Sequence, residues 1–263
     1  MPKTITSSEL LPLLEKVQSD FLDFITGFVK PYTVRTRPSA GKPDREHFDA
    51  ALGGSGTLVS AAAVRGILTA DHVLSEFPAG DPFGLIVLTR TGRNARKIIA
   101  DGIGRIPIAR GTDESKGPDL GLLVLSPSDA ADLEAAGKVF YNLSLRRSRM
   151  LNEPPPLQKG CAWVLCGMVG ERTKELRPER RFQIAKEFRG LYGPTVLAGH
   201  REEAGFDYLS VEVSYDGDYA GPNSFKGCSG GSLWQVLLKE RDGAVVVDDL
   251  RGCGTSTLQI AAK

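Results

Sequence analysis

One stretch near the end of the sequence decides how the rest is interpreted: Gly227-Cys228-Ser229-Gly230-Gly231-Ser232-Leu233-Trp234. Glycines on both sides of Ser229 allow the backbone to turn sharply and expose the serine hydroxyl. The same turn can direct backbone N–H groups at a developing negative oxygen, as an acyl-transfer nucleophile requires. Taken alone, these residues are also typical of a tight β-turn with a solvated serine. The choice between the two depends on whether the upstream sequence supplies a base and an acid.

The composition narrows the class of protein. The chain has 263 residues, a formal net charge of +1 and 41% hydrophobic residues, which is typical of a globular protein with one large or two small domains. The balanced charge gives no basis for nucleic-acid binding, and no apolar run has the length of a membrane span. The 3 histidines and 4 cysteines lack metal-ligand spacing, so we predict no metal and no cofactor. Because the N-terminus does not resemble an export signal, we expect a cytoplasmic protein with reduced thiols.

The pattern of apolar residues predicts a mainly β protein with an N-terminal helical extension. Residues 8–29 have helical periodicity, and residues 31–50 are predicted to be a polar linker. Short β-like runs separated by turns follow, which favours barrels or a sandwich over a doubly wound sheet. We therefore predict a helix and linker over 1–50, a first β unit over 51–150 and a second over 151–263. The clearest predicted strands are 57–59, 66–69, 85–88, 120–125, 162–167, 182–188, 208–213, 232–238 and 244–247, with a short helix over 128–137.

The candidate bases for Ser229 are His47, His72 and His200. His47 falls in the predicted linker, and His200 falls among charged residues in a predicted loop. His72 directly follows the apolar strand 66–69, where a side chain can be held rigidly at the edge of the core. His72 is therefore the predicted base.

The candidate acid is Asp119, which precedes the apolar run 120–125. Asp71 is adjacent to His72 in sequence, so its carboxylate is poorly placed to accept from that imidazole. The other aspartates considered lack a flanking buried strand: Asp101, Asp113 and Asp129. No histidine follows Ser229, which excludes the Ser–acid–His order of α/β-hydrolases. The order His72, Asp119, Ser229 is that of chymotrypsin-like enzymes.

The sequence resembles the trypsin/chymotrypsin-like serine peptidases at three motifs in the right order. Leu68-Thr69-Ala70-Asp71-His72-Val73 is similar to the family's LTAAHV, Asp119-Leu120-Gly121-Leu122-Leu123 to DLALL, and Gly227–Trp234 to GDSGGPLW. A weaker similarity joins Gly54-Ser55-Gly56-Thr57-Leu58-Val59 to GSGFLV.

The resemblance implies two antiparallel six-stranded β-barrels with the active site between them. Ser229 would attack a peptide carbonyl, His72 would take its proton, and Asp119 would orient His72. The backbone N–H groups of Gly227 and Ser229 would form the oxyanion hole. The resemblance also points to four residues for substrate binding, with Thr255 taking the place of a serine that supports the buried aspartate: Asn223, Thr255, Ser256 and Thr257.

Cys228 departs from the family. In zymogen-activated members an aspartate that pairs with a newly cut N-terminus occupies this position, and no such cleavage site precedes the first β unit. We therefore expect no zymogen activation, and control by a protein partner, by the N-terminal helix or by substrate supply. Cys228 is expected to point away from His72 and not to be the nucleophile. The expected function is a serine endopeptidase acting on a protein substrate; the alternative is a non-catalytic, protease-like binding module in a larger assembly.

Overall fold

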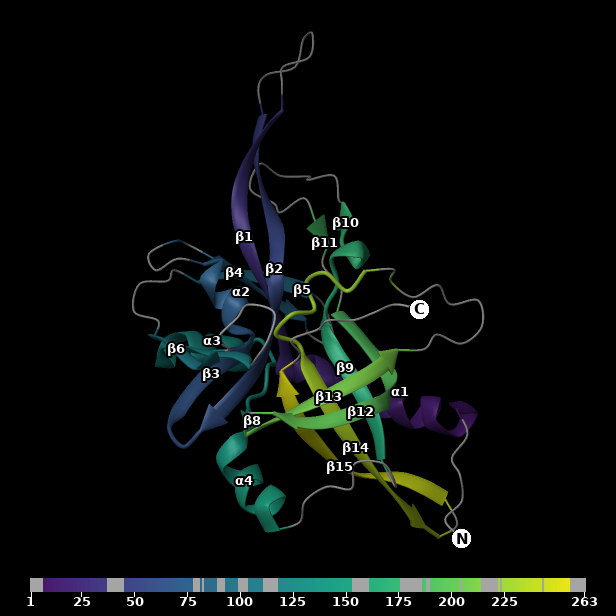
Figure 1. The fold of residues 1–263 in the computed structure, drawn as a ribbon. Helices are drawn as coiled ribbons and strands as arrows, with labels where there is room; N and C mark the ends of the chain where they lie inside the picture. Colours follow the sequence, from purple (N-terminus) through teal and green to yellow (C-terminus); the bar gives the residue numbers. More distant parts are fainter. Residues whose placement is uncertain are drawn as a thin grey trace.

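The computed structural model describes residues 7–36, 45–77, 81, 83–88, 93–98, 104–110, 118–152, 161–175, 186–187, 190–203, 205–213, 222, 224–242 and 244–255. Within these residues the chain is mainly β, with two large sheets that are antiparallel apart from one short strand (Figure 1). The predicted fold class is confirmed at this level. Neither sheet closes on itself within the described residues, so the pair of six-stranded barrels stays a prediction.

The first sheet has eight strands in the order β5-β4-β1-β2-β3-β7-β6, with β8 beside β2. Its strands are β1 (Ile25–Thr36), β2 (Arg45–Ala61), β3 (Val64–Thr69), β4 (Phe83–Leu88), β5 (Arg93–Ile98), β6 (Gly104–Arg110), β7 (Asp119–Val124) and β8 (Tyr141–Asn142). Three helices accompany it: α2 (Asp71–Ser75), α3 (Pro127–Ala135) and α4 (Leu143–Asn152).

The second sheet has five strands in the order β13-β12-β9-β14-β15. They are β9 (Cys161–Met168), β12 (Gly190–Glu203), β13 (Phe206–Val213), β14 (Ser232–Arg241) and β15 (Ala244–Thr255); a short pair, β10 (Lys174–Glu175) and β11 (Lys186–Glu187), stands apart. This strand order matches the order β3-β2-β1-β4-β5 within the first sheet. In both sheets the first of these strands along the chain lies between two antiparallel hairpins. The two halves thus share a topology that the sequence does not reveal as a repeat.

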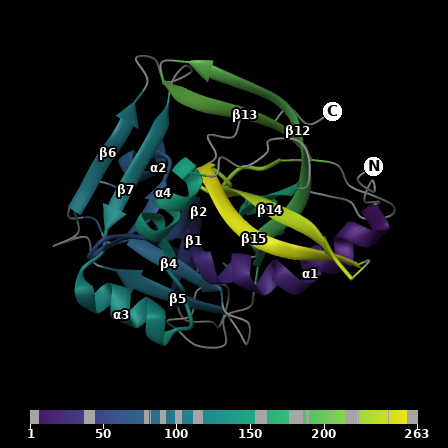
Figure 2. The ribbon, with the colours of Figure 1, turned by 90° about the horizontal axis from the view of Figure 1, so that it is seen from below.

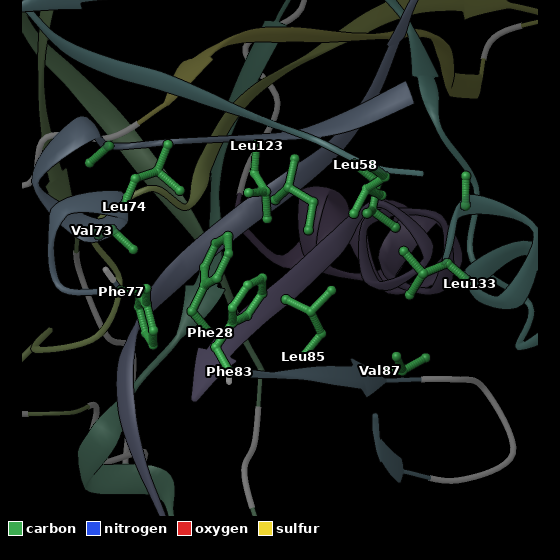
Figure 3. Close-up of a cluster of buried hydrophobic side chains, with 14 residues drawn as sticks. Phe28, Leu58, Val73, Leu74, Phe77, Phe83, Leu85, Val87, Leu123 and Leu133 are labelled. Atoms are coloured by element: carbon green, nitrogen blue, oxygen red, sulfur yellow. The ribbon is translucent and has the colours of Figure 1, made fainter. Parts of the chain in front are cut away.

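The first sheet surrounds a core of aliphatic and aromatic side chains (Figure 3). Phe28 of β1 stacks near Phe77 and Phe83, with ring centroids 5.7 and 6.1 Å away. Val73 and Leu74 of α2 belong to the same cluster. The short helix is therefore held in place by two buried side chains.

A second core joins the two sheets to α1 (Ser7–Phe24). The Trp234 ring on β14 is fully buried, with the rings of Phe21 and Phe24 at centroid distances of 5.7 and 5.2 Å. Figure 1 and Figure 2 show α1 beside the second sheet. The N-terminal helix thus covers the second sheet on the strand that follows Ser229.

The helix predicted over residues 8–29 is wrong at its C-terminal end. The helix ends at Phe24, and the following residues form β1, which lies between β2 and β4. Apolar residues at Ile25, Phe28 and Val29 fit a helix in spacing, but 25–29 are buried on both faces, as in a central strand. The predicted linker over 31–50 is also incorrect, since β1 extends to Thr36 and β2 begins at Arg45.

The segment around His200, which was predicted as a loop, is regular structure. His200 lies in β12, where its Nε2 is 2.9 Å from Asp207 Oδ1 on β13. Arg146 lies in α4 and donates to Asp249 Oδ1 of β15 at 2.7 Å, so it joins the two halves. No helix in the described part of the chain is long and apolar enough to cross a membrane.

Candidate active site

His72 and Asp119 lie together because β3 pairs with β7, with Thr69 opposite Gly121. The chain leaves β3 through Ala70 and enters α2, whose second residue is His72. The neighbouring Val73 is fully buried (Figure 3), whereas the His72 side chain is 49% exposed. The helix therefore presents the imidazole at the surface, beside the start of β7.

The Asp119 carboxylate contacts His72 at two points. Its Oδ1 accepts the backbone N–H of His72 at 2.9 Å, and its Oδ2 is hydrogen-bonded to the ring Nδ1. An ionised carboxylate can only accept, so Nδ1 carries the proton and Nε2 is left as an acceptor. Asp119 thus selects the tautomer of His72 that can act as a general base at Nε2.

The electrostatics of the pair favour its charged forms. The side-chain hydrogen bond to Asp119 raises the pKa of His72 above 6.5; partial burial opposes this, and the charges of Asp119, Glu76 and Asp71 add to it. Burial acts to raise the pKa of Asp119, but hydrogen bonds from the ring and backbone of His72 outweigh it and hold the pKa below 3.8. Asp119 is therefore ionised at neutral pH and stabilises the imidazolium that forms when His72 accepts a proton.

Ser229 lies in a tight turn over residues 225–231, here called the serine turn. Gly227 and Gly230 have φ of +97° and +80°, in the left-handed region that strains other residues. The N–H of Cys228 donates to the carbonyl of Phe225 at 2.9 Å, and the N–H of Gly231 donates to the carbonyl of Cys228 at 2.7 Å. The glycines predicted to permit a sharp turn are therefore used as such.

Two N–H groups of the serine turn point away from the donors that bind the neighbouring carbonyls. The carbonyls of Lys226 and Cys228 accept the N–H groups of Gly170 and Gly231, at 2.9 and 2.7 Å. In a trans peptide group the N–H points opposite to the carbonyl, so the N–H groups of Gly227 and Ser229 point away from these donors. Neither of these N–H groups donates to another group within the described residues. They can both donate to a negatively charged oxygen.

The serine turn packs against the segment that carries His72. A Cβ added to Gly230 would lie 2.0 Å from Thr69 Oγ1 and 3.0 Å from the nitrogen of Ala70, just before α2. Among the described residues no hydrogen bond joins the Ser229 hydroxyl to the His72 ring. Ser229 and His72 thus lie in touching segments, and hydrogen bonds between catalytic groups often tighten only when substrate binds.

Cys228 faces the second sheet. Its side chain is fully buried beside Val169 and Phe225, and its Sγ would lie 3.2 Å from a Cβ added to Gly167 on β9. Burial raises the pKa of this thiol to about 12. Because a thiolate is the reactive form of cysteine, this burial disfavours Cys228 as a nucleophile near neutral pH.

Sequence reasoning missed two residues next to the site. Arg110 on β6, a strand that the sequence pattern did not predict, is ion-paired through its guanidinium with Asp71. Ser55 contacts the serine turn through both its hydroxyl and its backbone N–H. The similarity of 54–59 to a family motif had marked this segment only as a strand, although a polar residue between two glycines was a usable signal.

The predicted specificity residues are only partly visible. Asn223, Ser256 and Thr257 lie outside the described residues. Thr255 is the last residue of β15, where its backbone pairs with Ser232. The backbone of His47 lies in β2.

We also looked for metal-binding groups among the described side chains and for similar proteins of known family. No group of three or more His, Cys, Asp or Glu side chains in the described part of the chain could hold a metal ion. Comparisons with protein-family models and with curated proteins found no match to the sequence.

Proposed function

We propose that this chain is a serine endopeptidase that uses Ser229, His72 and Asp119. The observation that carries the proposal is the two-point contact of Asp119 with His72, in a segment that packs on a turn presenting two N–H groups around Ser229. These are the parts that acyl transfer needs: a hydroxyl, a base in the correct tautomer and donors for an oxyanion.

In the proposed reaction the Ser229 hydroxyl attacks the carbonyl carbon of a peptide bond, and its proton passes to Nε2 of His72. The N–H groups of Gly227 and Ser229 donate to the carbonyl oxygen as it becomes negative. His72 then gives the proton to the leaving amine, and the acyl group stays on Ser229. A water molecule, deprotonated by His72, attacks the acyl-enzyme and releases the second product.

The topology supports a chymotrypsin-like pair of barrels as the proposed fold. Both sheets place their first strand between two antiparallel hairpins, and the candidate residues come from both. Asp119 begins β7 of the first sheet, His72 lies on α2 directly after β3, and Ser229 precedes the second sheet. The proposed substrate is therefore an extended polypeptide lying across the two sheets. A protein partner remains the proposed means of control.

A fluorophosphonate probe tests the proposal, because it phosphonylates an activated serine. We expect the wild type and Ser224→Ala to be labelled and Ser229→Ala not to be labelled. Ser224 is a suitable control because it is exposed and lies near the serine turn. Equal labelling of Ser229→Ala would overturn the assignment. If the wild type were neither labelled nor active on unfolded casein, the non-catalytic binding module would be favoured.

A further inference from the structure

Ser55 on β2 is fully buried and holds the serine turn at two carbonyl groups. Its hydroxyl donates to the carbonyl of Gly227 at 2.6 Å, and its backbone N–H donates to the carbonyl of Ser229 at 2.7 Å. The two carbonyls lie on either side of Cys228. One residue of the first sheet therefore fixes alternate peptide groups of the turn that carries the candidate nucleophile.

The direction of the hydroxyl bond follows from its partners. The Ser55 oxygen accepts the backbone N–H of Met168 at 2.7 Å, and a backbone N–H can only donate. The hydroxyl proton is then available for Gly227, whose carbonyl can only accept. The result is a buried chain of two hydrogen bonds from β9, through Ser55, to the serine turn.

The hydrogen bond from the Ser55 hydroxyl to the Gly227 carbonyl restrains a residue that is otherwise free to change conformation. With φ of +97° and no side chain, this residue has a wide choice of backbone angles. The peptide group before it is held by the N–H of Gly170 on the carbonyl of Lys226, at 2.9 Å. The peptide group after it is held by Ser55. With both neighbouring peptide groups fixed, the N–H of Gly227 keeps its direction.

A further hydrogen bond links Ser55 to the segment that carries the base. Thr69 Oγ1 donates to the carbonyl of Ser55 at 2.6 Å, and Thr69 lies three residues before His72. Within the described residues, the hydrogen bonds of Ser55 join uncharged groups. Cys228, between the two carbonyls, is an uncharged thiol in an apolar cluster.

We propose that Ser55 is a positioning residue that holds the Gly227 N–H in its donating direction through a neutral hydrogen bond. The inference rests on the proposed function, since it assigns the Gly227 N–H to the oxyanion. It also gives the serine turn a fixed active geometry that needs no buried ion pair at Cys228.

The test compares Ser55→Ala with Thr26→Val. Thr26 is also fully buried, and its Oγ1 donates to the carbonyl of Ile86 at 2.9 Å, so its removal deletes a similar hydrogen bond away from the serine turn. Thermal unfolding establishes that each variant is folded. The maximal rate of fluorophosphonate labelling and the probe concentration for half that rate are then measured separately.

We expect Ser55→Ala to lower the maximal labelling rate at least ~10-fold, since loss of a complete oxyanion donor lowers rates ~100-fold or more. The half-saturating probe concentration should change less than about twofold, because the hydroxyl does not line the binding surface. Thr26→Val should leave both quantities unchanged. A purely structural role for Ser55 predicts the same labelling rate in both folded variants, and that result would overturn the inference.

Two further outcomes are informative. If Ser55→Ala is unfolded at the assay temperature, Ser55→Cys replaces it, because a thiol is a much weaker donor in a similar volume; its result is read in the same way. If the wild type is not labelled at Ser229, the proposed function fails and this inference fails with it. If the wild type is labelled at Ser229 and the Ser55 variant is labelled at the same rate, the inference about Ser55 is refuted and the proposed function stands.

Discussion

The contact between Gly230 and the first sheet allows a quantitative test of how the site is assembled. A Cβ at this position would lie 2.0 Å from Thr69 Oγ1 and 2.2 Å from the carbonyl oxygen of Ser55. The Thr69 hydroxyl could rotate only by giving up its 2.6 Å hydrogen bond to that carbonyl, and the carbonyl itself is backbone. Gly230→Ala must therefore displace the serine turn.

The loss of stability expected for Gly230→Ala has two parts. The left-handed φ of +80° at Gly230 costs a residue with a side chain about 1–2 kcal/mol. Forcing an extra methyl group into a packed contact costs about 1–3 kcal/mol more, and the upper end applies because backbone is in the way. We expect Gly230→Ala to lower the free energy of unfolding by roughly 3–5 kcal/mol and to abolish labelling of Ser229.

Gly137→Ala is the matched control. Gly137 follows α3 with φ of +84°, and a Cβ there would meet nothing within 4 Å. This variant carries the conformational cost alone, about 1–2 kcal/mol, and should keep full labelling. Denaturant unfolding measures both variants. If Gly230→Ala were no less stable than Gly137→Ala and still labelled, the packing of the serine turn on β3 would be refuted.

Other contacts in the structure lead to three more predictions. The rate of wild-type labelling should fall as the pH drops through the raised pKa of His72, because a protonated imidazole cannot act as the base. Asp119→Asn should move the midpoint of this pH profile toward 6.5 and lower the maximal rate by up to ~10⁴-fold. An unchanged midpoint would show that Asp119 does not act on His72. Cys228 should resist iodoacetamide in the folded protein at neutral pH and react after unfolding in urea; rapid alkylation of the native thiol, mapped by mass spectrometry, would contradict its burial. Lys138→Met should lower the free energy of unfolding by about 2–3 kcal/mol, because the buried Lys138 Nζ donates to the carbonyl of Ile25 at 2.6 Å. An unchanged midpoint of denaturant unfolding would show that this hydrogen bond does not stabilise the fold.

The sequence was informative where the chemistry depends on residue type and order. Asp119 could be chosen over Asp71 because adjacent residues cannot form the required contact, and the structure pairs Asp71 with Arg110 instead. The sharp turn at Ser229 followed from its glycines, two of which adopt positive φ.

The sequence was uninformative where tertiary pairing decides the local structure. The apolar spacing from Ile25 to Val29 suits a helix as well as a strand buried on both faces, and only pairing with β2 and β4 selects the strand. His200 lies in a charged stretch that resembles a loop because both strands of its hairpin are largely exposed. Ser55 could not be assigned a role because its partners, Gly227 and Met168, are far away in sequence.

The neutrality of the serine turn has a consequence for the pH dependence of labelling. A turn held by a buried ion pair would lose its shape when either charged partner is removed or titrated. Here Ser55 holds the turn through uncharged groups, and the Cys228 thiol stays neutral until its pKa of about 12. The conformation of the turn should then be constant across the range in which His72 titrates. The pH dependence of labelling is then expected to follow the protonation of His72.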